Sequence, residues 1–305
     1  MAPQASATAP VRFGGTSRRP AATDDPDRRA ALRRGLVTLP GIVFILVVFV
    51  VPLSLVVQLA FQASGEWSLA QFHRLFETPL YQRVMFKTIW LSAIVAAIDF
   101  LLAYPLAVAL SQARGMVRWI VLVCILMPFW TNLLVRAYGW IVILHPYGLI
   151  NSALVWTGLI TEPLPLVHTT AGVIIGMSQI MLPYMVLPIS AQIQKMDPRL
   201  IHAARSLGAS LRRTFFLVYF PLTLPGVFAG TLVVFVMNLG FFVIPALLGG
   251  QRDVMMAQLI DTNFTTLLNW EFAAALCVVL LIATLGFFLT AQRWFRLDDL
   301  WTQAK

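Results

Sequence analysis

The chain has 305 residues, of which 59% are hydrophobic and only 11% are charged, and its formal net charge is +9 at pH 7. A soluble domain usually carries about 25% charged residues, and the mean hydropathy here is +0.81. This composition excludes an ordinary soluble domain and indicates a protein that lies largely in a lipid bilayer, where each spanning helix needs about 20 apolar residues.

The first 35 residues form a basic segment without the apolar periodicity of a helix or a strand. They are rich in Ala, Pro, Thr, Asp and Arg, a composition typical of disordered chain. Arg18 and Arg19 suggest a twin-arginine signal, but no apolar run follows promptly and no small-residue cleavage site closes the first apolar run. We therefore expect residues 1–35 to be a retained, disordered cytosolic tail, with residues 293–305 as a second cytosolic tail.

Six apolar segments follow the first tail, and each is long enough to span a bilayer. Prolines lie in or near many of them, which membrane helices tolerate because neighbouring helices satisfy the backbone groups that a proline leaves unpaired. We expect an all-α membrane protein with one six-helix transmembrane domain over residues 36–292. The predicted spans cover approximately residues 36–61, 88–110, 117–144, 170–193, 215–246 and 267–290.

The distribution of positive charge predicts the orientation of the spans. Most of the 22 lysines and arginines lie in the terminal segments, in the 111–118 turn and in the loop over residues 195–213. Cytoplasmic segments carry such an excess, so we expect both termini and the 195–213 loop to be cytoplasmic. The same rule accounts for the net charge without a nucleic-acid partner. The opposite loops carry slightly more acids, Asp253 among them, than bases, which fits either a surface for a binding protein or ordinary solvated loop.

Residues 195–221 form the one long polar break in the second half of the chain. Asp197 and Pro198 predict a helix start, because the carboxylate can accept a backbone hydrogen bond and the proline ring fixes φ. Gly208 predicts the helix stop, since glycine adopts the left-handed conformation without steric cost. We expect a short amphipathic helix over residues 198–208 at the membrane surface, and such a helix suits docking into a groove on another protein.

Small and apolar side chains share one side of this expected helix. Four of them recur at helical spacing: Leu200, Ala203, Ala204 and Leu207. The two alanines would let a partner surface approach the backbone closely. Ser210 offers a second N-cap, so a second short helix is expected before Pro221.

The spacing of this loop resembles the EAA loop of permease subunits in bacterial ATP-binding-cassette (ABC) importers. The matching pattern is Ala203-Ala204-x3-Gly208-x9-Val218-x-Phe220-Pro221. In that family the loop forms a coupling helix that seats in a cleft of the cytoplasmic ATPase. The resemblance therefore implies an ATPase-coupling role for His202, Ala203, Ala204, Leu207, Gly208 and Pro221. His202 departs from the acidic residue that is usual in the family, so an ion pair there is not implied.

Four further strings resemble the first permease subunit of spermidine/putrescine importers. They are MPFWTNLLVRAYGWIVIL at 127–144, GLIN at 148–151, LPYMVLP at 182–188 and FVIPALLGG at 242–250. The similarity extends over roughly residues 36 to 292. It implies the type I importer permease fold, in a multi-pass protein of the bacterial inner membrane.

The same resemblance implies the partners and the cargo. A second, similar permease, two ATPase subunits that use ATP and magnesium, and an extracytoplasmic solute-binding protein would complete the importer. The chain itself is then expected to bind no cofactor or metal and to catalyse no reaction. The expected cargo is a polyamine such as putrescine or spermidine, with an opine, an amino acid derivative or an oxyanion as alternatives.

Polar and aromatic side chains inside the spans are candidates for the solute path. Asp99 lies midway along the second span, where a carboxylate costs ~2.5–3.5 kcal/mol and should face protein or a water-filled cavity. It would attract a cationic solute or pair with a neighbouring polar group. Arg136 is expected to be structural, because a path for a polycation would not present an arginine. The other candidates, which would contact the solute or bond between helices, are Asn132, Tyr184, Asn238 and Phe241.

Two rival functions need features that the sequence does not show. A secondary transporter should have an internal inverted repeat, and no clear repeat is present. An intramembrane enzyme needs a convergent catalytic or metal-binding set, whereas the four histidines have no metal-ligand spacing and no HExxH or P-loop pattern occurs. An ATP-driven importer is favoured, with an ATP-independent transporter as the alternative.

Overall fold

A computed structural model describes the backbone of residues 26–63 and 65–294 and the side chains of residues 39–63 and 65–293. Within these residues, six helical segments are long and apolar enough to cross a membrane. They are Leu39–Ala60, Pro79–Gln112, Leu133–Trp156, Thr170–Lys195, Leu211–Leu239 and Trp270–Arg293. The prediction of a helical membrane protein with six spans is confirmed. A small exception to the all-α prediction is the antiparallel hairpin of β1 (Gln62–Ala63) and β2 (Glu66–Trp67).

The chain divides into two units, residues 1–54 and 55–305. Helix α1 (Pro26–Ala60) begins well before residue 35, so the predicted end of the disordered tail is wrong, and residues 1–25 lie outside the described part. In the first unit, the described side chains of α1 are exposed all round. A helix that is apolar on every side is expected to be surrounded by lipid or by other membrane helices.

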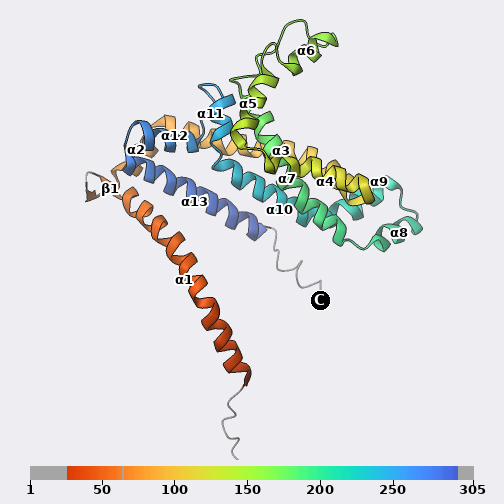
Figure 1. The fold of residues 1–305 in the computed structure, drawn as a ribbon, viewed down its shortest axis with the longest axis horizontal. Coiled ribbons are helices and arrows are strands. Elements are labelled where there is room, and N and C mark those ends of the chain that lie inside the picture. Colours follow the sequence, from red (N-terminus) through yellow and green to blue (C-terminus); the bar gives the residue numbers. More distant parts are fainter. Residues whose placement is uncertain (1–25, 64, 295–305) are drawn as a thin grey trace, which may run out of the picture. The chain divides into compact units, whose positions relative to one another are not determined.

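Three long helices form the core of the second unit (Figure 1). They are α3 (Pro79–Gln112), α7 (Thr170–Lys195) and α10 (Phe220–Leu239). Fully buried Leu91, Met181 and Val234 are among the apolar residues that join them. Because lipid is as apolar as these side chains, association of such helices depends on close packing rather than on the hydrophobic effect.

Two glycines bring α7 and α10 into close contact. A Cβ atom at Gly226 would lie 2.8 Å from the Pro188 carbonyl oxygen and 3.1 Å from the Ile189 Cα. At Gly230 it would lie 2.9 Å from Met185 Sδ and 3.1 Å from the carbonyl oxygen of the same residue. Small residues at these two positions are therefore a condition for the pairing of the helices.

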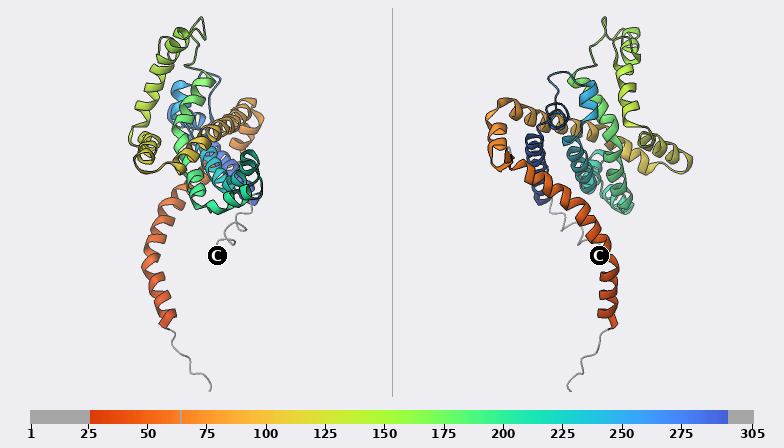
Figure 2. Two further views of the ribbon diagram at one scale, coloured as in Figure 1. Left: turned by 90° about the vertical axis from the view of Figure 1, so that its right-hand side faces the viewer. Right: turned by 60° about the vertical axis from the view of Figure 1, so that its left-hand side comes forward.

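The remaining elements surround the three-helix core. Helix α13 (Trp270–Trp294) packs against the start of α3, where the rings of Phe272 and Tyr81 have centroids 4.9 Å apart. Helix α6 packs on α5 (Leu133–Leu144), and Figure 2 shows this pair extending beyond the core. The shorter helices are α2 (Ala70–Glu77), α6 (Leu149–Trp156), α11 (Val243–Leu248), α12 (Met256–Asp261) and the π-helix η2 (Thr262–Thr266).

The third predicted span, residues 117–144, is wrong, because the structure breaks it into α4 (Gly115–Trp130) and α5. Pro128 lies in the last turn of α4 and cannot donate a backbone hydrogen bond. Asn132 then starts a new helix, since its side-chain oxygen accepts from the Leu134 amide at 2.8 Å. Helix α4 is left as a shorter apolar helix, and the third membrane-length segment is Leu133–Trp156.

Other boundaries differ less. The second span begins at Pro79 rather than near residue 88. The fifth span ends at Leu239 instead of continuing to residue 246, because Gly240 closes α10 and α11 starts afterwards. Helix α13 reaches Trp294, so the predicted C-terminal tail lies outside the described residues from 295 onward.

Candidate functional site

Helix α8 (Pro198–Ser206) is the short surface helix that the sequence predicts, although it ends at Ser206 rather than at residue 208. The carboxylate of Asp197 accepts a hydrogen bond from the Arg199 amide at 2.9 Å, and Pro198 occupies the first turn. Both start signals thus act as expected, and they fix where the helix leaves the end of α7.

A backbone motif stops α8. Gly208 has φ of +84°, in the left-handed region. Its amide donates to the Arg205 carbonyl at 3.0 Å, and the Ala209 amide donates to the Ala204 carbonyl at 3.1 Å. These two bonds form a Schellman motif, in which the left-handed residue reverses the chain after the last turn.

Helix α8 has no buried residue, although Ile201 and Ala204 are half-buried. His202 and Ala203 are exposed, Ala204 is half-buried, and the Leu207 side chain just beyond the helix is 89% exposed. Figure 1 shows α8 and α9 (Leu211–Thr214) at one end of the core, with α2 and α12 at the opposite end. Apolar and basic side chains that protrude together from a rigid helix are typical of a surface for another protein.

An aromatic cluster fastens this loop to the core. The chain passes from α9 into the π-helix η1 (Phe215–Tyr219) and then into α10, with Pro221 exposed in the first turn of α10. The Tyr104 ring of α3 lies 6.1 Å from the Phe215 ring and 5.7 Å from the Phe220 ring, measured between centroids. Aromatic pairs at this spacing add to packing energy. This cluster was not among the features predicted from the sequence, although the aromatic run at 215–220 could have indicated it.

Polar contacts join the ends of α7 and α10 beside this loop to each other and to α3 and α4. The Tyr104 hydroxyl and the Thr223 hydroxyl lie 3.2 Å apart. Gln192 of α7 donates to the Leu222 carbonyl of α10 at 3.2 Å. Arg118 donates to the Gln194 side chain at 2.9 Å. The loop that carries α8 therefore begins and ends on helices that are bonded to each other.

The predicted path residues fall in two different places. Asp99 and Asn238 are fully buried in the three-helix core, on α3 and α10. Ser178 of α7 faces Asp99, and among the described residues the side-chain polar atoms of all three make no hydrogen bond. Buried polar groups are normally paired, so these groups are unusual for a purely structural core.

The second place is the break between α4 and α5. Asn132 is exposed there, and the Phe129 ring lies 5.1 Å from the half-buried Tyr184 ring of α7. Arg136 is half-buried, lies within electrostatic range of Tyr184, and has a buried Nε atom that finds no partner in the described chain. Phe241 is not part of this group, because it packs against the core beyond the end of α10.

A cavity of about 370 Å³ lies beside this break, between α3, α4 and α7. Its lining is mostly apolar, but it includes Gln179, whose side-chain oxygen accepts from the Trp140 indole at 3.4 Å. Pro128 and Pro183 also line it. The helix break thus lies next to a mostly apolar cavity with one polar side chain, Gln179, in its lining.

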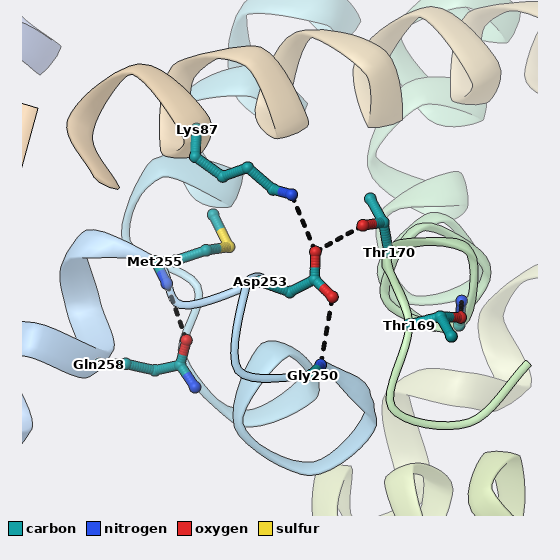
Figure 3. A network of polar contacts seen from close by, with 8 residues as sticks. Lys87, Thr169, Thr170, Gly250, Asp253, Met255 and Gln258 are labelled. Atoms are coloured by element: carbon teal, nitrogen blue, oxygen red, sulfur yellow. Dashed lines mark hydrogen bonds and ion pairs between the residues drawn. The ribbon is translucent and has the colours of Figure 1, made fainter. Parts of the chain in front are cut away.

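Figure 3 shows a polar network at the opposite end of the core, around Asp253. The carboxylate forms an ion pair with Lys87 of α3 at 2.9 Å and accepts hydrogen bonds from the Thr170 hydroxyl of α7 and from the Gly250 amide. The side chain of Asp253 is only 5% exposed, so an ordinary solvated loop, one of the two alternatives for the acids of these loops, does not describe this position. The network, here called the Asp253 junction, ties the loop before α12 to two of the core helices, α3 and α7.

The charge of Asp253 is favoured by its partners. Burial raises the pKa of the carboxyl group, but the bonds from Thr170 and Gly250 and the ion pair with Lys87 outweigh burial and leave the pKa below its usual value. We expect Asp253→Asn to lower the free energy of unfolding by about 1–3 kcal/mol at neutral pH, because it leaves Lys87 without its charge partner.

The pH dependence of this loss follows from the direction of the pKa shift. The stabilisation is complete above the pKa of an unfolded aspartate, about 3.9, and it disappears as the pH falls through the lower pKa of the folded state. Denaturation of the parent and of Asp253→Asn in detergent, measured from pH 7 to about pH 2, should show a difference in stability that is constant above about pH 4 and shrinks only below it. A constant difference at all pH values would contradict this role.

Among the described residues, no three His, Cys, Asp or Glu side chains gather in a group that could hold a metal ion. That the chain works without a metal or a bound cofactor stays a prediction.

The structure defines the class of the protein as a multi-pass helical membrane protein. It has six membrane-length helical segments, a close-packed three-helix core and a capped surface helix on a polar loop. The chain belongs to the family of binding-protein-dependent transport system inner membrane components, whose model matches residues 100–293.

Relatives of known name agree with this assignment. The spermidine/putrescine transport system permease protein PotB of Haemophilus influenzae is 37% identical over 204 residues, which cover 67% of this chain and 71% of the relative. PotB of Escherichia coli K12 is 37% identical over 216 residues, covering 71% and 78% of the two chains. A crystal structure of a bacterial ABC transporter that imports alginate shares the fold, with a TM-score of 0.70, 20% identity and coverage of 88% and 96%.

The chain is therefore a permease subunit of an ABC importer and a multi-pass protein of the inner membrane. Its named relatives are transport permeases and not enzymes.

Proposed function

We propose that this importer carries a polyamine such as putrescine or spermidine into the cell. The proposal is supported by the 37% identity to two PotB proteins over more than two thirds of the chain. A solute-binding protein outside the membrane would deliver the polyamine, in keeping with the description of the family. A second, similar permease would supply the other half of the path.

Two cytoplasmic ATPase subunits that use ATP and magnesium would drive the transport, and α8 would be their contact on this chain. The observation that carries this step is a helix without any buried residue, whose two ends are fixed by an N-cap and a Schellman motif. A rigid helix of this kind can transmit a displacement, whereas a flexible loop would absorb it. In this arrangement both termini and α8 lie on the cytoplasmic side, as the excess of positive charge in these segments favours.

The connections of α8 to the core support its role as a lever that moves α7 and α10. The helix is joined to α7 on one side and, through η1, to α10 on the other. Because α7 and α10 touch at Gly226 and Gly230, they move together more easily than they slide apart. Closure of the ATPase dimer would tilt this pair and expose the path alternately to the two sides of the membrane.

The path itself would begin at the α4–α5 break. Asn132 and Tyr184 lie at its open edge, and aromatic rings there could bind an ammonium group through cation–π contacts. The buried pair of Asp99 and Ser178 lies deeper, on α3 and α7. The Asp99 side chain, whose oxygens accept no hydrogen bond in the described chain, would become available to the cation when α7 moves.

If Asp99 has this role, replacing it should preserve the stability of the protein and reduce transport. Asp99→Leu removes an unpaired buried polar group, whose burial costs about 1–3 kcal/mol, so thermal stability in detergent should stay equal or rise. Polyamine uptake should fall by at least about tenfold. Ser92→Ala, which removes another buried and unpaired group of the described core, is the control and should leave uptake unchanged. Normal uptake by Asp99→Leu would remove Asp99 from the path.

The whole proposal is tested by reconstitution of the four-subunit complex in proteoliposomes with the binding protein and labelled putrescine or spermidine. Uptake should require ATP and should stop when the ATPase carries an inactive nucleotide site. Uptake that continues without ATP would identify a secondary transporter. ATP-dependent transport of an opine, an amino acid derivative or an oxyanion, but of no polyamine, would contradict the proposed cargo. The assignment as an ATP-driven importer would still stand.

A further inference from the structure

We infer that the surface of the ATPase that receives α8 is acidic. Positive charge around α8 and negative charge on the ATPase would then select the partner. This inference rests on the proposed docking of α8 and adds the chemistry of the surface that receives it. It concerns the residues from the end of α7 to the end of α9, here called the coupling segment, Lys195–Thr214.

The coupling segment presents positive charge and no free carboxylate. Its five basic side chains are all exposed: Lys195, Arg199, Arg205, Arg212 and Arg213. None of them forms an ion pair with a carboxylate of the described chain. The one acid in the segment, Asp197, is occupied as the N-cap of α8. These positive charges are therefore free to attract an acidic partner surface.

The basic residues on α8 are arranged along the helix. Arg199, His202 and Arg205 follow each other at a spacing of three residues, which places them in one oblique row. His202 is exposed within this row. A carboxylate at this position would interrupt the positive surface, so the residue type at 202 contributes to partner choice.

An acidic protein cleft explains the segment better than anionic lipid does. A helix that lies in the lipid interface buries long apolar side chains such as Trp, Phe and Leu along one face. Two of the four residues on the apolar side of this helix are alanines, Ala203 and Ala204, which offer little apolar surface to lipid but let a protein wall approach the backbone. The strongly exposed Leu207 then stands at the tip of the helix, where it can enter a pocket. Complementary charge around such an anchor steers encounter and excludes wrong partners.

The test measures binding of the ATPase that drives uptake to the full-length permease in phosphatidylcholine nanodiscs. The double variant Arg199→Glu with Arg205→Glu should bind about tenfold more weakly or worse, because two attractive contacts become repulsive. His202→Glu should weaken binding by a smaller factor. Arg199→Lys with Arg205→Lys keeps the charges and should bind like the parent. Arg83→Glu, which changes another exposed arginine near the start of α3, is the control.

The parent should also lose affinity as the NaCl concentration rises, since exposed charges are screened. Equal binding by the parent and the double variant, with no dependence on NaCl, would overturn the acidic surface but leave docking intact. No binding by the parent at all would instead refute the proposed coupling. If the double variant changes binding only in nanodiscs that contain phosphatidylglycerol, the basic residues serve the lipid surface and the inference fails.

Discussion

Gly208→Val is expected to reduce ATP-driven uptake by about tenfold or more while the protein still inserts into the membrane. Gly208 holds φ of +84° in the Schellman motif that ends α8. A side chain in this left-handed conformation costs roughly 1–2 kcal/mol, and a β-branched residue is an outlier there. A Cβ atom at this position meets nothing within 4 Å, so the effect comes from backbone strain and not from a clash. The strained loop would redirect the chain after α8 and disengage the lever.

Gly208→Asn is the matched control, because asparagine tolerates the left-handed conformation at a helix end. It should retain most of the uptake. The measurement compares initial rates of polyamine uptake in proteoliposomes that contain equal amounts of each permease. Normal transport by the valine variant, or equal losses in both variants, would contradict the lever.

Gly226→Val is expected to disrupt the pairing of α7 and α10. The added Cβ atom would lie 2.6 Å from the Gln192 Cβ and 2.8 Å from the Pro188 carbonyl oxygen. Backbone atoms cannot rotate away as a long side chain can, so the helices must separate. Overpacking of this kind typically costs about 1–3 kcal/mol, which should lower the apparent melting temperature in detergent by several degrees and reduce the yield of assembled complex.

Gly286→Val on α13 provides the comparison, since a Cβ atom there meets nothing within 4 Å. Its stability should change only by the difference in helix propensity between valine and glycine, which is close to zero. Thermal unfolding followed by size-exclusion chromatography separates the two variants. Equal melting temperatures for both would show that the α7–α10 contact does not limit stability.

The sequence predicts features that depend on neighbouring residues. Asp197, Pro198 and Gly208 are local signals for the ends of α8, and each acts in the structure as its chemistry requires. The membrane segments are also predictable, because a long apolar run has few alternatives to a spanning helix. The break at Asn132 was missed, since hydropathy continues through it and membrane helices often tolerate a proline such as Pro128.

Contacts between residues that are distant in the chain could not be predicted from the sequence. Thr170 and Asp253 are separated by 83 positions, and nothing near Asp253 in the chain distinguishes it from a solvated loop acid. The same holds for Tyr104 and Thr223, 119 positions apart. The candidate path residues illustrate the limit, because hydropathy places Asp99 and Asn132 equally inside spans, whereas the fold buries the first and exposes the second.

The central claim, that α8 meets the ATPase in the cytoplasm, is tested most directly by labelling Ala203→Cys. The two native cysteines, Cys124 and Cys277, are first replaced by serine. A membrane-impermeant maleimide should label residue 203 in inside-out vesicles that lack the ATPase, and bound ATPase should protect it. In right-side-out vesicles the residue should stay unlabelled. Labelling from the outside, or labelling that the ATPase does not alter, would contradict the account.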